Sequence, residues 1–308
     1  MEAVWTMLQE KTTKKEGLSP KRRVYDVVMR ALLWLSAGIT CALLLFLLGY
    51  IFYRGVPYLS LEFLTSKESV LNNVDGILPA IWNTVYVVAV TLLIALPLGV
   101  GAAVYLTEYA QNRKLVAIIE FATETLSGIP SILYALVGLL IFSQFLGLQK
   151  TLLAASLTLV IMNLPTIIRT TQESLKTVPQ SWREGALGLG AGKWRMIRTV
   201  VLPNSIDGIV TGCILAVGRI VGESAVLLYI AGMGTALNRF VSFVQEWPFV
   251  DLSGMVNSAG STLTVMLYVY AKERSNFDMA FAVAVVLIVI TLVINLAANF
   301  AGKKLKKK

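Results

Sequence analysis

Two charged residues lie inside an otherwise apolar stretch and are the first candidates for chemistry. Arg219 and Glu223 are four residues apart within residues 209–232, so they share one face if the stretch is helical. An arginine at mid-membrane costs roughly 2.5 to 3.5 kcal/mol on insertion scales, which makes such residues functional candidates. Either the two charges neutralise each other and fix this helix to its neighbours, or Arg219 faces a polar path. In the second interpretation, which is compatible with the first, the planar guanidinium attracts an oxyanion and Glu223 orients it.

The residue types that most enzymes and metal sites use are scarce. The chain has no histidine, and its two cysteines, Cys41 and Cys213, each lie in an apolar run. A Ser/His/Asp or Cys/His set therefore cannot be assembled, and no disulfide framework is expected. The sequence Gly190-Ala191-Gly192-Lys193 resembles the end of a phosphate-binding loop, but the flanking positions hold Leu187 and Trp194 instead of Gly and Ser or Thr. We expect no enzyme activity, no cofactor, no metal and no ATP site.

The composition predicts an all-α polytopic membrane protein. Of the 308 residues 56% are hydrophobic and 15% are charged, and the mean hydropathy is +0.72. Uncharged or nearly uncharged runs long enough to cross a bilayer number about six. We place the spans at residues 31–53, 77–106, 115–148, 151–168, 209–232 and 279–300, with Pro97 bending the second late and Pro165 breaking the fourth. No soluble domain with its own core is expected between them.

Most of the 27 lysines and arginines fall on one side of these spans. They gather in the N-terminal tail, the loop before the third span, the segment before the fifth span and the C-terminal run. By the positive-inside rule, both termini are cytoplasmic. We therefore divide the chain into a basic tail (1–30), a transmembrane domain (31–302) and a second basic tail (303–308) whose lysines bind lipid headgroups. Because the net charge of +9 flanks apolar runs, it indicates a membrane and not nucleic acid.

The cytoplasmic segment 173–205 carries a spaced motif. Permeases of bacterial ABC importers share Glu-Ala-Ala, three residues, Gly, nine residues, Ile, any residue and Leu-Pro, and this segment resembles that pattern. The matching positions are Glu184, Gly185, Ala186, Gly190, Val200, Leu202 and Pro203, with Gly185 standing for Ala and Val200 for Ile. In the family this segment is the coupling helix that sits in a cleft of the ATPase subunit. The resemblance thus implies a type I ABC importer permease fold and a short helix that ends at Gly190.

The surroundings of Arg219 resemble the phosphate importer's permeases more closely. The run Gly218-Arg219-Ile220-Val221-Gly222-Glu223-Ser224-Ala225 is similar to that family's Gly-Arg-Ala-Ile-Gly-Glu-Thr-Ala signature, and both charges match. Further matches lie at residues 96–99, 105–109, 126–132 and 163–171. The resemblance favours the PstA-type subunit. It implies a PstC-type second permease, two PstB-type ATPases, an external PstS-type phosphate-binding protein and a bacterial inner-membrane location.

The sequence allows two interpretations each for Arg169, for the pair Glu120 and Glu124, and for the substrate. Arg169, at the cytoplasmic end of the fourth span, is either part of the translocation path or an interfacial anchor. Glu120 and Glu124 share a helical face and are expected to contact another subunit or a loop. The substrate could be another oxyanion such as molybdate or sulfate, because only the Arg219 region indicates phosphate. A non-transport membrane scaffold is the remaining alternative, which the coupling motif opposes.

Overall fold

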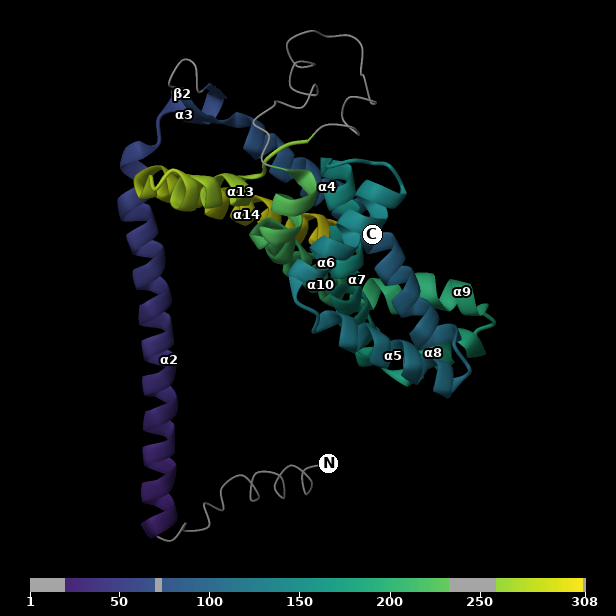
Figure 1. Ribbon diagram of the computed structural model, residues 1–308. Helices are drawn as coiled ribbons and strands as arrows, with labels where there is room; N and C mark the ends of the chain where they lie inside the picture. The colour runs from purple at the N-terminus through teal and green to yellow at the C-terminus, as the bar shows by residue number, and fades with distance from the viewer. Residues whose placement is uncertain (1–19, 70–73, 233–258, 307–308) are drawn as a thin grey trace. The chain divides into compact units, whose positions relative to one another are not determined.

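The computed structural model describes residues 20–69, 74–232 and 259–306, which are almost entirely helical (Figure 1). Most of the basic N-terminal tail and much of the segment after the fifth predicted span lie outside these residues. The chain divides into two units, residues 1–53 and 54–308. The helices are α2 (Pro20–Gly55), η1 (Val56–Tyr58), α3 (Leu61–Thr65), α4 (Leu78–Val104), η2 (Tyr105–Tyr109), α5 (Arg113–Ser127), α6 (Ser131–Gly138), η3 (Leu139–Phe145), α7 (Leu152–Thr177), α8 (Gln180–Gly188), α9 (Lys193–Met196), η4 (Ile197–Val201), α10 (Leu202–Gly222), η5 (Leu227–Ala231), α13 (Leu263–Tyr268), η6 (Val269–Glu273) and α14 (Phe277–Lys306).

The predicted set of about six spans is confirmed, with one change of form. In the described residues, five helices are long and apolar enough to cross a membrane: Val24–Tyr58, Leu78–Tyr109, Leu152–Thr177, Lys193–Gly222 and Phe277–Lys304. The sixth candidate is a pair of helices, 113–127 and 131–145, that meet at 100°. The third predicted span, over 115–148, is therefore a bent pair of helices and not one continuous helix. The bend falls at Gly128-Ile129-Pro130, because a proline disfavours helical backbone at the residue before it.

Two other predicted boundaries are also wrong. Pro165 does not break the fourth span, since α7 continues through it to Thr177. Membrane helices tolerate such a proline where neighbouring helices support the freed backbone group. The fifth span is a continuous helix from Lys193, and it ends at Gly222, ten residues earlier than the predicted Gly232. Glu223 is in extended backbone (φ −78°, ψ 121°), so the break lies inside the apolar stretch.

Helix α7 is the centre of the bundle and packs against α4, α5, α6, α10 and η5. Small residues allow α10 to approach it closely. A side-chain carbon added at Gly212 would collide with the Thr170 hydroxyl, and one at Gly208 would collide with the Ser174 side chain. Successive glycines on α10 thus face positions that step backward along α7, so the two helices are antiparallel. This small-residue spacing is the usual way for membrane helices to bring their backbones together.

At the end of the bundle away from α5, α8 and α9, a short hairpin and a further helix pack on α14 (Figure 1). The antiparallel strands β1 (Lys67–Ser69) and β2 (Val74–Ile77) pair Lys67 with Ile77 and Ser69 with Val74. The helical stretch 263–273 lies in a segment predicted only as an outer loop. Its Leu263 and Tyr270 are buried against this end of the bundle.

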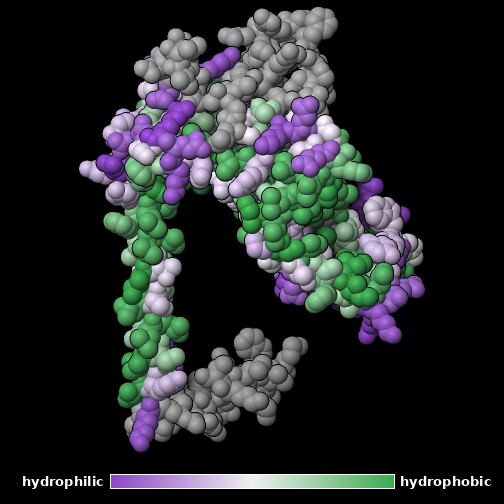
Figure 2. Space-filling view, viewed as in Figure 1, coloured by the Kyte–Doolittle hydropathy of each residue, from purple (hydrophilic) through white to green (hydrophobic). Residues whose placement is uncertain are grey.

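Side chains of like hydropathy gather in bands. Figure 2 shows hydrophobic side chains over the middle of the helix bundle and hydrophilic ones at its two ends. Helix α2, taken by itself, is hydrophobic along most of its length (Figure 2). The apolar band is what a bilayer requires of a polytopic protein.

Candidate functional site

Arg219 lies three residues before the end of α10 at Gly222, next to the break inside the fifth predicted span. Its Nη1 donates a hydrogen bond to the Thr166 hydroxyl of α7, 3.4 Å away. The packing of Gly212 on Thr170, two turns earlier on α10, sets this position because the helices are antiparallel. The side chain is only partly buried, so some of its donors remain accessible. Within the part of the chain that the structure describes, Arg219 forms no ion pair.

Glu223 does not pair with Arg219, which corrects the predicted shared helical face. Because α10 ends at Gly222, Glu223 lies just before the next helical segment, which begins at Ala225. Its Oε1 accepts hydrogen bonds from the backbone N–H groups of Ala225 (2.9 Å) and Val226 (3.3 Å). On the other side of the break, the Thr264 hydroxyl donates to the Val221 carbonyl (2.5 Å). Glu223 is thus an N-cap that stabilises the helix break.

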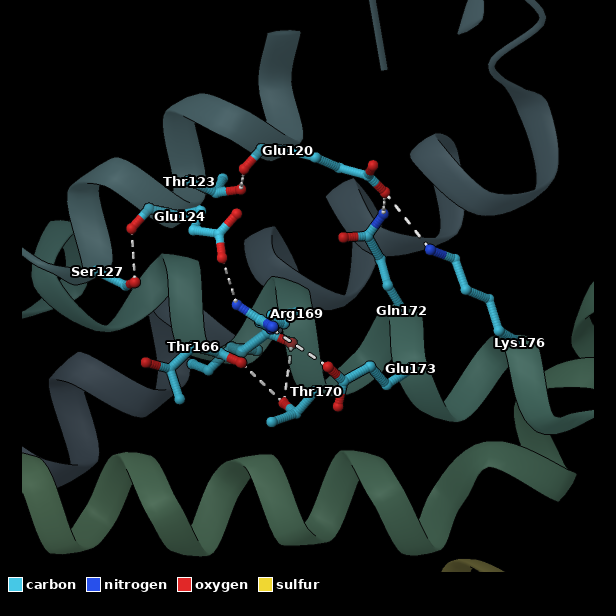
Figure 3. A network of polar contacts seen from close by, with 11 residues as sticks. Glu120, Thr123, Glu124, Ser127, Thr166, Arg169, Thr170, Gln172, Glu173 and Lys176 are labelled. Atoms are coloured by element: carbon cyan, nitrogen blue, oxygen red, sulfur yellow. Dashed lines mark hydrogen bonds and ion pairs between the residues drawn. The ribbon is translucent and has the colours of Figure 1, made fainter. Parts of the chain in front are cut away.

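A polar pocket of about 450 Å³ opens next to Thr166, between α5 and α7 (Figure 3). Arg169 lies within it and is 62% exposed; its Nη1 is 3.4 Å from Glu124 Oε1 and its Nε is 3.2 Å from Glu173 Oε1. Farther along α7, Lys176 Nζ lies 3.5 Å from Glu120 Oε1, which also accepts a bond from Gln172 (3.2 Å). Glu120 and Glu124 therefore contact α7 of their own chain.

The charge balance of this pocket bears on Arg169. Three carboxylates, from Glu120, Glu124 and Glu173, face two cations, Arg169 and Lys176. Arg169 is thus held by two carboxylates through Nε and Nη1, and a bound anion would compete with these carboxylates or displace one of them. Exposed ion pairs of this kind are weak, so such displacement needs little energy. No three Cys, Asp or Glu side chains in the described ranges are placed to hold a metal ion.

Helix α8 contains the coupling motif and ends as the motif predicts. The N–H of Gly190 donates to the Leu187 carbonyl (2.9 Å) and that of Ala191 to the Ala186 carbonyl (3.1 Å). This pair of bonds is a Schellman motif, which requires a left-handed residue at its turn. Gly190 supplies it with φ +82°. The predicted short helix that ends at Gly190 is confirmed.

The surface of this segment is exposed and partly apolar. Glu184 and Gly185 are exposed on α8, and Ala186 is half-buried. Trp182 is 50% exposed and Leu189 is 91% exposed, next to the turn. Leu202 and Pro203, both half-buried, lie where η4 passes into α10, inside the continuous helix that starts at Lys193. The motif residues therefore run from an exposed helix into a membrane span.

One pair of residues at this segment was missed by the sequence analysis. Arg183 of α8 and Glu108 of η2 form an ion pair at 2.8 Å, and their side chains are only 11% and 7% exposed. Arg183 also donates to the carbonyls of Val178 (2.5 Å) and Leu175 (2.8 Å) at the end of α7. The available signal was Glu108 at the end of an apolar run, but nothing in the sequence indicates its partner 75 residues away.

Residues 95–308 match the family model described as binding-protein-dependent transport system inner membrane component. The chain is 37% identical to "Probable ABC transporter permease protein YqgI" of Bacillus subtilis, over 80% of this chain and 83% of that protein. It is 32% identical to "Phosphate transport system permease protein PstA" of Haemophilus influenzae, over 75% and 80% of the two chains. It is 30% identical to the PstA protein of Mycobacterium leprae, over 82% and 87%.

Solved structures show the same fold. A chain of the bacterial alginate ABC transporter, in complex with an alginate-bound periplasmic protein, matches with a TM-score of 0.61 at 15% identity, over 93% of this chain and 99% of that one. A chain of the MetNI methionine ABC transporter matches with a TM-score of 0.54 at 22% identity, over 75% and 94%. The predicted type I ABC importer permease fold is thus confirmed. The chain is a multi-pass membrane protein and belongs to the family of binding-protein-dependent transport system inner membrane components.

Proposed function

We propose that this chain is the PstA-type permease subunit of an ATP-driven phosphate importer in a bacterial inner membrane. Family membership implies an ATPase and a substrate-binding protein as partners. The relatives from H. influenzae and M. leprae, which are named as phosphate transport permeases, support phosphate as the substrate. The observation that carries the proposal is Arg219 at the helix break, bonded to Thr166 beside a polar pocket.

Arg219 is the residue that we assign to the substrate. A cation inside a span is costly unless an opposite charge compensates it, and Glu223 is engaged by backbone N–H groups instead. A phosphate oxyanion passing the break would supply that opposite charge, and the planar guanidinium can donate to two of its oxygens at once. Glu223 contributes by fixing the break that presents Arg219.

Arg169 is proposed as a second position on the path. Its guanidinium lies one helical turn from Thr166, in the pocket between α5 and α7. Glu124 and Glu173 hold it in place when no anion is present. A passing phosphate would exchange with one of these carboxylates, and the weakness of exposed ion pairs allows its release afterwards.

The coupling contact is assigned to the exposed end of α8. Glu184, Gly185, Ala186 and Gly190 form the short helix and its stop, and the bulky Leu189 projects beside the turn. A short helix with an exposed apolar end suits docking into a groove of a partner. Leu202 and Pro203 lie in the membrane helix that carries Arg219 near its end. This chain therefore moves substrate, and ATP hydrolysis belongs to the partner.

The full assembly in this proposal contains a PstC-type second permease, two PstB-type ATPases and an external PstS-type phosphate-binding protein. Both termini face the cytoplasm, with residues 1–30 and 303–308 as basic tails on either side of the permease domain. The coupling segment 173–205 lies on that same side, where it can meet the ATPase. The lysines and arginines that gather on this side of the spans support this orientation.

Uptake in proteoliposomes tests the proposal. The complex with its binding protein is reconstituted with wild type, Arg219→Gln or Glu184→Lys, and ATP-dependent uptake of labelled phosphate is measured with ATPase activity. Arg113→Gln, at the exposed start of α5, is the matched control. We expect Arg219→Gln to abolish uptake in an assembled complex and Glu184→Lys to uncouple ATP hydrolysis from uptake. Normal uptake by Arg219→Gln would contradict the role of Arg219.

A further inference from the structure

We propose that the Arg183–Glu108 ion pair is the positioning link through which movement of α8 reaches the membrane helices. The inference rests on the proposed function, because it assumes that α8 contacts an ATPase. It concerns two residues that the coupling motif does not include. They act on transport through the helices that they join and do not touch the substrate.

The pair connects three elements at one point. Arg183 on α8 donates from Nε (3.1 Å) and Nη2 (2.8 Å) to the same oxygen of Glu108. Glu108 lies on η2, which continues α4 in one candidate span, Leu78–Tyr109. Through Nη1 and Nη2, the same guanidinium bonds the carbonyls of Val178 and Leu175, which end α7. One side chain thus ties α8 to the ends of two membrane helices.

Burial singles out this contact. Among the nine residues of α8, all of which the structure describes, Arg183 is the one buried residue, and Ala186 is half-buried against the same core. Helix α8 also packs on α9 and η4, but its buried polar contact with the ends of α4 and α7 is the one that Arg183 makes. Just after the turn, Lys193 lies with its Nζ 5.0 Å from the ring centre of Tyr109, a weaker second connection to η2.

The chemistry of the Arg183–Glu108 pair suits a role in positioning α8 against α4 and α7 better than a role in stability alone. A buried ion pair gives little more stability than well-packed apolar residues of the same volume, because both charges must be removed from water. What it adds is geometry: a planar guanidinium with four bonds fixes both the distance and the orientation of α8 relative to α4 and α7. Apolar packing would let α8 slide.

A double-mutant cycle distinguishes a link from a merely structural contact. Glu108→Gln, Arg183→Met and the double variant are reconstituted with the ATPase and binding protein, and Arg113→Met serves as the exposed control. Co-purification measures assembly, and the readout is the amount of phosphate taken up per ATP hydrolysed in assembled complexes. A structural contact would change the amount of complex and leave this ratio unchanged.

We expect the ratio to fall by about threefold or more in each single variant, and the double variant to be no worse than the poorer single one. A fall of less than about threefold in the assembled single variants would overturn the link. Should Arg183→Met not assemble, Glu108→Gln decides, since it keeps the side-chain shape and one acceptor oxygen. Absence of phosphate uptake by wild type contradicts the proposed function instead, so the two failures are distinguishable.

Discussion

Gly212 of α10 lies against the Thr170 hydroxyl of α7 so closely that no side chain fits between them. Thr170 cannot easily turn away, because its hydroxyl also donates to the Thr166 carbonyl (2.9 Å). The same two helices meet again where Arg219 bonds Thr166. The glycine contact therefore sets the register that places the charged residue beside the polar pocket.

Replacement of Gly212 by alanine should weaken the α7–α10 contact. We expect a loss of about 1–3 kcal/mol from overpacking, seen as a lower thermal midpoint of the purified complex. The matched control is Gly218→Ala on the same helix, where an added carbon meets no atom within 4 Å. That control should be neutral or stabilising. Equal midpoints for the two variants would contradict the close packing.

Replacement of Gly190 by alanine should disturb the end of α8. Left-handed backbone costs an L-residue about 1 kcal/mol or more, and Gly190 has φ +82°. Gly188→Ala, which is helical and meets nothing within 4 Å, should be neutral or slightly favourable. Binding of the ATPase to each variant can be titrated in detergent. Weaker binding by Gly190→Ala than by Gly188→Ala is expected, and the reverse order would refute the role of the turn.

Glu223 should tolerate glutamine better than alanine. Its role in the structure is to accept two backbone hydrogen bonds, which an amide oxygen can also do. Glu223→Ala removes the cap and should cost about 1 kcal/mol of stability, whereas Glu223→Gln should cost little. Thermal denaturation of the two complexes measures the difference. Equal losses in both variants would show that the charge of Glu223, and not its cap, is what stabilises the break.

For the buried Arg183–Glu108 pair, the double variant should be more stable than the single variant Arg183→Met. Arg183→Met leaves the Glu108 carboxylate buried without its cation, which costs about 3–5 kcal/mol in comparable sites. Adding Glu108→Gln removes that charge and should restore part of the loss, although the Leu175 and Val178 carbonyls stay without Arg183 as donor. The thermal midpoint of the double variant is thus expected above that of Arg183→Met. A midpoint below it would mean that the carboxylate is compensated in another way.

Much of the fold could be predicted because a helix that crosses a bilayer must be long and mostly apolar. Apolar length identified the spans, and the spaced motif around Glu184 and Gly190 identified a short exposed helix with a glycine stop. The bend at Pro130 was also signalled, since Gly128-Ile129-Pro130 is a poor helix sequence. It was overlooked because the apolar run continues on both sides of it.

Other features depend on contacts that a single sequence does not show. Pro165 lies inside a continuous helix because α7 is surrounded by neighbouring helices, and Glu223 leaves its helix although the apolar pattern continues past it. The pairing of Glu108 with Arg183, and that of Arg169 with Glu124, join residues far apart in the chain. Charge patterns indicate that such residues need partners, but only the packing of helices selects which ones.

Phosphate transport is the central function proposed for this permease. Its most direct test is ATP-dependent uptake of labelled phosphate by proteoliposomes that contain the wild-type complex and its binding protein, with unlabelled sulfate or molybdate added in excess. We predict uptake that requires ATP and is unchanged by either competitor. Uptake of sulfate or molybdate in place of phosphate, by a complex that hydrolyses ATP normally, would contradict the claim.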